Sequence, residues 1–360
     1  MPARALIAMS GGVDSSVAAA RLLADGWEVV GVTLHLWDYP DDGSVRGRCC
    51  APEDIHDARR VADVLGIPHY AFDRREEFER EIVTPFVESY LKGETPSPCV
   101  RCNRGVKMKE LFRLADQLGA ERVATGHYAR IRREGEVLQL LRARDASKDQ
   151  SYFLHMLGQP ELMRLAFPLG DSEKHEVRAE AERLGLPGAG KGESQELCFV
   201  PTGRYDELVS ARAADRLRPG PIVDADGRVV GSHGGVHRFT RGQRKNLGVA
   251  LGERAFVVDI DAASATVRLG SREQLASSVA ELDELSLATD VCLPLRAEVA
   301  VRYRGEAYPA EVRAAPGGGA PVRFDSPVRA VVPGQFAVFY RGDRVLGGGR
   351  ITHSSRRGSA

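Results

Sequence analysis

The run Ser10-Gly11-Gly12-Val13-Asp14-Ser15-Ser16 stands between an apolar stretch and a helical pattern. Ala5–Met9 precedes it and predicts a strand, and Val17–Leu23 follows it and predicts a helix. Glycines let a backbone approach its ligand closely, and the N–H groups of a helix start favour negative charge. Asp14 adds a carboxylate, which is what a Mg²⁺–phosphate site requires. The stretch therefore predicts a cradle for a phosphorylated ligand.

Two common nucleotide-binding loops do not match this run. GxxxxGK[ST] requires a lysine that is absent here, and GxGxxG has the wrong glycine spacing. The run instead resembles the SGGxDSS signature of the PP-loop ATP pyrophosphatases. That resemblance implies cleavage of ATP between the α and β phosphates and adenylation of a carbonyl or amide oxygen, with Asp14 near the Mg²⁺ of the nucleotide.

Length and composition narrow the class of protein further. The chain has 360 residues, which favours two or three domains, and 43% hydrophobic residues, enough for real cores. No apolar stretch is long enough to cross a membrane, and the N-terminus lacks a secretory pattern, so we expect a cytoplasmic protein without a membrane partner. Fifty basic and fifty acidic residues give zero net charge. This argues against general adhesion to nucleic acid and leaves room for local basic patches.

Strands and helices alternate in the first half of the chain, which predicts an α/β fold with a doubly wound parallel sheet. Pro85 should bend or break the helix expected over residues 76–90. Ligands of such sheets lie at the carboxyl ends of the strands, where both Ser10–Ser16 and Gly126-His127 are expected. The expected strands are 6–9, 28–36, 68–72, 121–125 and, more weakly, 138–141, and the helices are 15–24, 52–65, 76–90, 107–118 and 174–184.

After about residue 205 the pattern changes to short alternating apolar runs separated by glycine and proline. Such runs predict β-rich modules. We therefore expect a catalytic domain over 1–204, a small central β-rich domain over 205–277, a C-terminal β-barrel over 278–356 that lies away from the chemistry, and a disordered tail over 357–360.

The cysteines indicate either reactive thiols or a metal site. Cys99 and Cys102 lie in a proline-rich segment over 95–103 that predicts an exposed loop, and the neighbouring Arg101 and Arg104 should favour the thiolate of Cys102. Cys198 follows almost a hundred residues later, behind a glycine-rich stretch. Structural disulfides are rare in cytosolic proteins, so reactive thiols or a metal site are the alternatives.

These motifs together resemble the tRNA-specific 2-thiouridylases, which place sulfur on the wobble uridine (U34). The resemblance extends from residue 4 to residue 353. It rests on the PP-loop and on five further segments: Gly126-His127-Tyr128-Ala129, Lys148-Asp149-Gln150-Ser151-Tyr152, Cys198-Phe199-Val200, Arg241-Gly242-Gln243-Arg244 and Arg302-Tyr303.

The resemblance implies a role for each matching residue. Cys198 carries a persulfide and Cys102 is its partner, which attacks the persulfide or closes a transient disulfide as sulfur leaves. ATP is bound by Ala8, Met9, Ser10, Gly11, Gly12, Val13, Asp14, Ser15, Leu34 and Gly126. Ser97, Pro98 and Cys99 hold the target base. The anticodon loop of tRNA is contacted by His127, Lys148, Asp149, Gln150, Arg302, Tyr303 and Gln335.

Several alternatives stay open at this point. Some members of the family carry Asp where this chain has Cys99, so Cys99, Cys102 and Cys198 could instead hold an iron–sulfur cluster of the 4Fe-4S type. Cys49 and Cys50 could complete a zinc site, although adjacent cysteines are poorly spaced for zinc. An amidotransferase or ligase of the PP-loop class, or a non-catalytic RNA-binding protein, would also need ATP. The protein that donates sulfur, a cysteine desulfurase or a relay protein, is not evident from the sequence.

Overall fold

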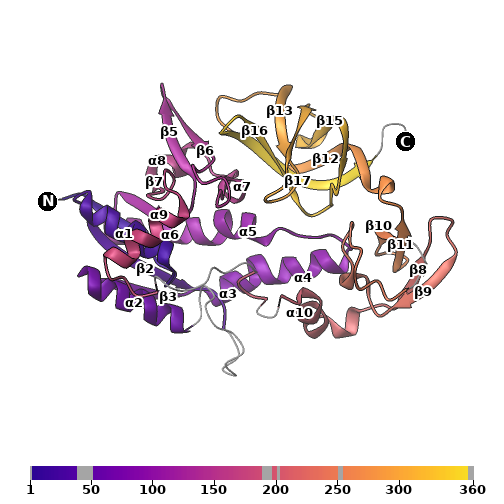
Figure 1. The fold of residues 1–360 in the computed structure, drawn as a ribbon, viewed down its shortest axis with the longest axis horizontal. Helices are drawn as coiled ribbons and strands as arrows, with labels where there is room; N and C mark the ends of the chain where they lie inside the picture. Colours follow the sequence, from indigo (N-terminus) through magenta and orange to yellow (C-terminus); the bar gives the residue numbers. More distant parts are fainter. Residues whose placement is uncertain (1, 39–51, 189–196, 201–202, 250–253, 356–360) are drawn as a thin grey trace.

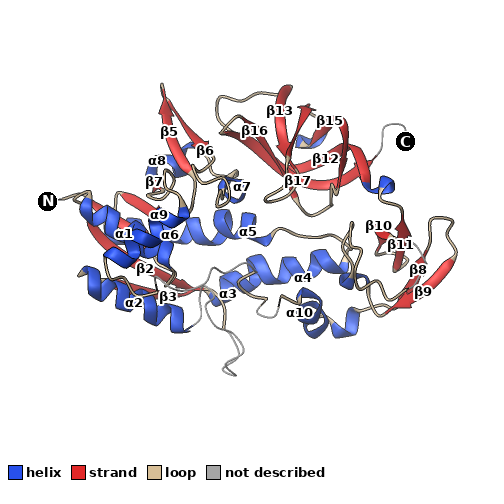
Figure 2. Ribbon diagram, in the orientation of Figure 1, coloured by secondary structure: helices blue, strands red, loops and turns tan. Residues whose placement is uncertain are grey.

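The computed structural model describes residues 2–38, 52–188, 197–200, 203–249 and 254–355. Figure 1 shows an α/β unit at the N-terminal end, a small β unit at the opposite end and a β-barrel packed beside both. Helices and strands are distributed accordingly, with almost all helices in the first unit (Figure 2). This arrangement confirms the expected fold class. No helix among the described residues is long and apolar enough to span a bilayer.

A five-stranded parallel sheet forms the centre of the first unit, in the order β3-β2-β1-β4-β7. Leu6 and Ile7 of β1 are both fully buried although they face opposite sides, as a sheet covered by helices on both faces requires. The chain reverses its direction of winding between β1 and β4, so the loops that follow these two strands lie next to each other. The strands are β1 (Arg4–Ala8), β2 (Glu28–His35), β3 (His69–Asp73), β4 (Arg122–Thr125) and β7 (Leu165–Ala166).

Two π-helical segments interrupt the helices of this unit. One of them, η1, ends two residues before Pro85, which lies in the first turn of α4, so the missing N–H of proline is accommodated and the helix continues to Leu91 rather than breaking. The helical segments are α1 (Val13–Ala24), α2 (Pro52–Leu65), α3 (Arg75–Phe78), η1 (Glu79–Val83), α4 (Thr84–Leu91), α5 (Pro98–Arg101), η2 (Cys102–Met108), α6 (Lys109–Leu118), α7 (Ser151–Leu154), α8 (Gln159–Arg164), α9 (Lys174–Arg183) and α10 (Tyr205–Arg212).

The thiol-bearing segment differs from the expected loop. A helix begins at Pro98 and runs through α5 and η2 into α6, so Cys99 and Cys102 lie in its first turns. Pro98 occupies the first turn, where proline is tolerated because the N–H groups there have no partner within the helix. The sequence placed the start of this helix at residue 107, nine residues too late.

Residues 138–141 also differ from expectation. They belong to a β-hairpin, β5 (Arg130–Glu134) and β6 (Val137–Leu141), rather than to the parallel sheet. Gly135 has φ +59° in the tight turn between the two strands, a conformation that favours glycine. β6 then pairs with the barrel strand β17 at Leu141 and Arg344. The hairpin thus joins the catalytic unit to the barrel.

The central unit is a small sheet in the order β10-β11-β8-β9. Val257, Val267 and Leu269 are almost completely buried and form its core with Ile222. Its strands are β8 (Gly220–Val223), β9 (Val229–His233), β10 (Phe256–Asp261) and β11 (Thr266–Gly270), and its short helical turns are η3 (Ala214–Arg216) and η4 (Val236–Arg238).

The C-terminal sheet closes into a barrel because β12 pairs with both β15 and β17. Phe339 and Leu346 are fully buried inside it. Its strands are β12 (Ala276–Leu287), β13 (Leu295–Ala300), β14 (Ala307–Val312), β15 (Ala320–Arg329), β16 (Phe336–Arg341) and β17 (Arg344–Ser355), with the turns η5 (Glu273–Leu275) and η6 (Pro316–Gly318). The tail expected to be disordered, 357–360, lies outside the described residues.

Candidate active site

The loop between β1 and α1 has the form of an anion cradle. Gly11 has φ +69°, and a Cβ at this position would lie 2.4 Å from the carbonyl oxygen of Asp54, so only glycine fits. Gly12 caps α1, and the Ser15 hydroxyl donates to the Gly12 carbonyl over 3.0 Å. The backbone N–H of Ser10 donates to the same hydroxyl over 3.2 Å. These bonds hold the start of α1 open towards a ligand.

Gly126 brings the loop after β4 against this cradle. A Cβ at Gly126 would lie 2.8 Å from the backbone nitrogen of Ser15 and 3.2 Å from the Cβ of Asp14. A larger residue would therefore separate the two loops. The carboxyl ends of β1 and β4 form one site, as the winding of the sheet predicts.

Asp14 is paired with a residue that sequence analysis missed. The ammonium of Lys174 lies 2.6 and 2.7 Å from the two carboxylate oxygens of Asp14, and the Tyr128 hydroxyl donates to Oδ1 over 2.8 Å. The side chain of Lys174 is only 9% exposed. The helix that begins with Lys174 was predicted, but no sequence signal places its first residue beside a loop 160 residues away.

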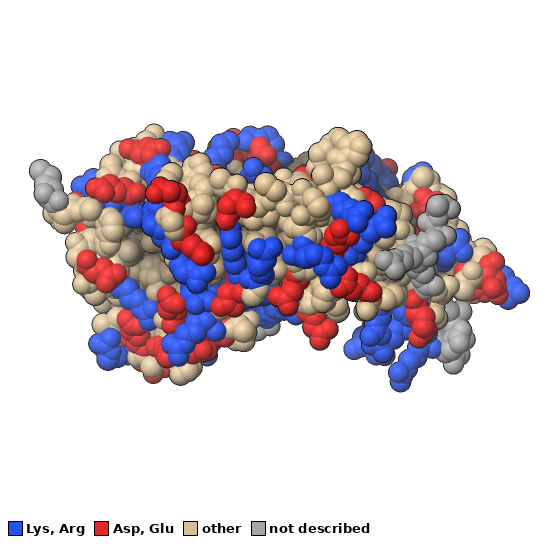
Figure 3. Space-filling view, turned by 90° about the horizontal axis from the view of Figure 1, so that it is seen from above, with Lys and Arg blue, Asp and Glu red and all other residues tan. Residues whose placement is uncertain are grey.

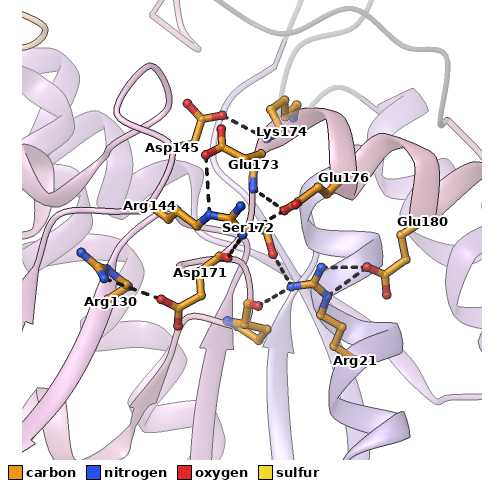
Figure 4. Close-up of polar contacts among 11 residues, drawn as sticks. Arg21, Arg130, Arg144, Asp145, Asp171, Ser172, Glu173, Lys174, Glu176 and Glu180 are labelled. Atoms are coloured by element: carbon orange, nitrogen blue, oxygen red, sulfur yellow. Dashed lines mark hydrogen bonds and ion pairs between the residues drawn. The ribbon is translucent and has the colours of Figure 1, made fainter.

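Helix α9 is held in this position by a polar network on its N-terminal side (Figure 4). The backbone N–H of Lys174 donates to Asp145, and Arg21 of α1 bonds to both Glu180 and Ser172. Asp145 also accepts from the Ser147 N–H and hydroxyl at 3.0 and 2.6 Å. The network therefore ties α9 both to α1 and to the loop that carries Lys148 and Gln150.

A cavity of about 690 Å³ opens above the cradle and collects most of the predicted site residues. Every residue predicted to bind ATP and every residue predicted to hold the base lines it. It is also lined by His127, Lys148, Gln150, Tyr303 and Gln335 from the predicted RNA-binding set. Lining residues that sequence analysis did not name as site residues include Asp54, Lys107, Phe153, Lys174 and Arg304.

The two predicted catalytic thiols do not line this cavity. Cys102 is 6% exposed and belongs to the main apolar cluster, and Cys198 packs against the same cluster. Among the described residues Cys99, Cys102 and Cys198 carry no disulfide, and Cys99 alone of the three reaches the cavity wall.

The electrostatic surroundings of Cys102 differ from those predicted. Burial raises the pKa of the Cys102 thiol to about 11, and the charge that opposes this is that of Lys107. Burial likewise raises the pKa of Cys99. Arg101, expected to favour the thiolate, is instead paired with Glu284 of the barrel. Cys102 is therefore a neutral thiol in this state, because desolvation outweighs the nearby cation.

An aromatic cluster anchors the short segment that carries Cys198. Phe199 is 1% exposed and makes edge contacts with Phe78 and Phe86 at centroid distances of 5.6 and 4.9 Å. Leu197, on the other side of Cys198, lines the cavity. Cys198 therefore stands between the core and the cavity wall. Residues 189–196, which include most of the glycine-rich stretch before it, lie outside the described residues.

Asp149, which stands between Lys148 and Gln150, is buried within the protein. It is 8% exposed, and its carboxylate accepts from the Ala143 N–H at 3.0 Å and from the N–H and hydroxyl of Ser151 at 3.1 and 2.9 Å. The backbone N–H of Tyr128 donates to the side-chain oxygen of Gln150, and the backbone N–H of Gln150 donates to the Tyr128 carbonyl. Arg302 is exposed and does not line the cavity.

The barrel covers the cavity, contrary to the expectation that it would lie away from the chemistry. Gln335 donates to the carbonyl oxygen of Thr95 over 2.8 Å. Tyr303 packs on Phe153 with ring centroids 4.3 Å apart, and both line the cavity. The pairing of β6 with β17 and the hydrogen bonds of Pro333 and Gln335 to Thr95 hold this side of the barrel against the first unit.

Known proteins and family models match almost the whole length of this chain. A model described as "tRNA methyl transferase HUP domain" matches residues 3–202, a "tRNA methyl transferase PRC-barrel domain" matches 209–271 and an "Aminomethyltransferase beta-barrel domain" matches 277–351. The tRNA-specific 2-thiouridylase MnmA of Sorangium cellulosum is 66% identical over 99% of this chain and 94% of its own length. The chain belongs to the tRNA-specific 2-thiouridylase family. The enzyme of the same name from Geobacter metallireducens is 48% identical over 99% of this chain and 98% of its own.

Solved structures match less closely. A 4-thiouridine synthetase–RNA complex with bound ATP shares 18% identity at a TM-score of 0.35, covering 59% of this chain and 51% of that chain. At this similarity no residue role is transferred from it.

The residues of the site fit a Mg²⁺ ion but do not fit an iron–sulfur cluster. Asp14, which faces the cradle, fits a Mg²⁺ ion carried by ATP. An iron–sulfur cluster does not fit, because the described residues contain no group of three or more His, Cys, Asp or Glu side chains arranged to hold a metal. Cys49 and Cys50, the other half of the zinc alternative, lie outside the described residues.

Proposed function

We propose that this chain converts the wobble uridine of tRNA into 2-thiouridine in the cytoplasm, using ATP to activate the C2 oxygen and a Cys198 persulfide as the sulfur source. The observation that carries the proposal is the single cavity that joins the PP-loop, the thiol-bearing helix and the barrel residues Tyr303 and Gln335. A nucleotide and a splayed-out base can meet there.

ATP would lie with its phosphates on Ser10–Ser15 and its adenine beside Leu34 and Gly126. Lys174 and Lys148 line the same cavity as the start of α1, whose N–H groups favour negative charge. A Mg²⁺ ion held by Asp14 would neutralise phosphate charge. The C2 oxygen of uridine attacks the α phosphate, pyrophosphate leaves, and the oxygen becomes part of an adenylate.

Sulfur transfer would follow at C2. The terminal sulfur of the Cys198 persulfide attacks C2, and the C2–O bond breaks as AMP leaves. The Cys102 thiolate then attacks the Cys198 sulfur, and the electron pair of the broken S–S bond passes to the sulfur on C2. The products are 2-thiouridine, AMP, pyrophosphate and a Cys102–Cys198 disulfide. The two sulfur-bound protons end on the phosphate products through solvent.

Two partners complete this cycle. A persulfide-bearing protein, a cysteine desulfurase or its relay protein, reloads Cys198, and a dithiol reductant reopens the disulfide. Because Cys102 is buried as a neutral thiol, it must be exposed to lose its proton, and we assign that change to binding of RNA.

RNA contacts are proposed for the charged face around the cavity. Figure 3 shows Lys and Arg side chains in a broken band across this view, with acidic residues between them. Lys148, His127 and Gln150 line the cavity and would contact the anticodon loop. Asp149 would act indirectly, because its carboxylate holds the segment from within. Binding through phosphates should weaken as salt increases.

Mass spectrometry of nucleosides tests the proposal directly. Unmodified tRNA is incubated with the protein, Mg²⁺-ATP, a cysteine desulfurase with cysteine, and dithiothreitol, and 2-thiouridine is measured. We expect Cys198→Ala and Cys102→Ser to abolish it while tRNA binding is retained, and Asp14→Ala to block AMP formation. Cys292→Ser is the matched control, because Cys292 is exposed in the loop between β12 and β13 and does not line the cavity.

Three outcomes would contradict parts of the proposal. Full thiolation by either cysteine variant removes the role of that thiol. Normal pyrophosphate release by Asp14→Ala removes the assignment of Asp14. Absence of 2-thiouridine with the wild-type protein, when the desulfurase is active, removes the proposed reaction itself.

A further inference from the structure

The segment that leads into the thiol-bearing helix is held by the barrel. The backbone N–H of Thr95 donates to the Pro333 carbonyl over 2.9 Å, and Gln335 returns a bond to the Thr95 carbonyl. Gly334 has φ +93°, and a Cβ there would lie 2.9 Å from the Thr95 backbone, so this close approach requires glycine. The position of the helix start therefore depends on the barrel.

A second contact reaches the helix itself, at Arg101, the residue directly before Cys102. The guanidinium of Arg101 pairs with the carboxylate of Glu284 on β12. Arg350 of β17 contacts the same carboxylate over 3.0 Å and also pairs with Glu94 over 3.2 Å. Glu284 thus contacts one end of the segment over 94–101 directly and the other end through Arg350, which Asp283 also binds over 3.0 Å.

The backbone at Glu284 is irregular in a way that directs this side chain. The register of β12 against β17 shifts between Asp283 and Ser286, so Glu284 and Leu285 together stand opposite the single residue Gly349. Such a bulge redirects a side chain that a regular strand would place elsewhere. Glu284 also has φ +47°, in the left-handed region that non-glycine residues avoid unless their surroundings impose it.

Stability alone does not account for this arrangement. The side chains of Arg101 and Glu284 are 36% and 34% exposed, and ion pairs at such exposure contribute little to the free energy of unfolding because water and salt screen them. A strained residue in a bulge is a costly way to form a weak pair. The effect of the ion pair is on geometry, because the pair orients Arg101 and therefore the turn that carries Cys102.

We propose that Glu284 is a positioning residue for sulfur transfer, which holds the Cys99–Cys102 turn against the barrel through Arg101. The inference rests on the proposed function. It predicts that loss of the Glu284 carboxylate leaves formation of the adenylate intact and slows the sulfur step, because the cradle lies on other loops. The activated RNA is then hydrolysed by water, and ATP is consumed without thiolation.

The test is the ratio of 2-thiouridine formed to AMP released. We expect Glu284→Gln to lower this ratio about tenfold, in line with the sensitivity of group transfer to small displacements. AMP release should stay at the wild-type rate. Arg101→Met should lower the ratio similarly, and the double variant should be no worse than either single one, because both remove the same contact.

Glu281→Gln is the matched control, since Glu281 is an exposed carboxylate three residues earlier on β12. Hydrogen exchange provides a readout independent of catalysis, and the amides over 99–108 should exchange faster in Glu284→Gln than in Glu281→Gln. An unchanged ratio overturns the proposal, as does an equal fall of AMP and 2-thiouridine. If the wild-type protein forms no 2-thiouridine, the proposed function fails, and unchanged exchange over 99–108 overturns the positioning role separately.

Discussion

Lys174 neutralises Asp14 across 160 residues of sequence. Its ammonium contacts both carboxylate oxygens at 2.6 and 2.7 Å and lies 5.6 Å from the centre of the Tyr128 ring. Both residues line the cavity, and Asp14 belongs to the anion cradle itself. A Mg²⁺ ion arriving with ATP would take over Asp14 and leave the ammonium beside the phosphates, where positive charge stabilises the departing pyrophosphate.

Replacing Lys174 by Met should therefore lower the rate of pyrophosphate release roughly a hundredfold, the usual effect of losing one preorganised charge or donor. The measurement is release of pyrophosphate with saturating Mg²⁺-ATP and tRNA. Arg183→Met serves as the control, because Arg183 is an exposed cation at the end of the same helix. A Lys174→Met protein with wild-type kcat would show that the ammonium only fastens α9 to the loop.

Cys102 should resist alkylation in the protein alone. Its thiol has a pKa of about 11 and is buried. At pH 8 the thiol is therefore almost entirely protonated, and iodoacetamide cannot reach the sulfur. The rate should rise steeply only as the pH approaches 11. The exposed Cys292 is the internal comparison and should react quickly at pH 8. Peptide mass spectrometry separates the two sites, and equal labelling of both at pH 8 would contradict the buried neutral thiol.

Two histidines with lowered pKa values, the buried His155 and the half-buried His127 of the cavity wall, should make the protein sensitive to mild acid. Burial lowers the pKa of His155 to about 4 from 6.5, and that of His127 to about 3. Between pH 6.5 and 4 the unfolded chain binds protons that the native protein does not, so the free energy of unfolding falls as the pH falls. Each group contributes at most about 1.4 kcal/mol per pH unit.

Urea unfolding at pH 7, 6 and 5 measures this slope. His155→Gln should flatten it, because Gln can donate to the Tyr152 carbonyl as the imidazole does over 2.8 Å, without titrating. His56→Gln is the control, since His56 is exposed. The same slope in wild type and His155→Gln would mean that His155 is not responsible.

Asp149→Asn should destabilise the protein by about 2–3 kcal/mol, because the amide cannot accept the full set of bonds that the buried carboxylate accepts. The pairing with Arg142, which stacks on Tyr340 at 3.6 Å, is weakened as well. Thermal or urea unfolding gives the value. Asp171→Asn, whose side chain is 84% exposed, should change stability by less than about 0.5 kcal/mol. An Asp149→Asn protein as stable as the wild type would contradict the structural role of this carboxylate.

Local patterns were sufficient to predict the parallel sheet and the phosphate cradle. An apolar strand, a glycine turn and a helix start are contiguous in the sequence, whereas the close approaches of Gly11 to Asp54 and of Gly126 to Ser15 are visible only in the fold. The same local reasoning failed at Pro98, since a proline-rich segment is compatible with both a loop and the first turn of a helix. It also failed at 138–141, where only the hairpin partner distinguishes a buried parallel strand from an antiparallel one.

The sequence by itself determined the class of fold, the cradle and the resemblance to the thiouridylases, because these depend on neighbouring residues or on quoted motifs. Tertiary structure decided the rest. Burial, not the adjacent arginines, sets the pKa of Cys102, and the packing of the barrel on the first unit brings Gln335 and Glu284 to a helix about 200 residues earlier in the chain. Desolvation and long-range contact arise from how the whole chain packs, and no short stretch of residues encodes them.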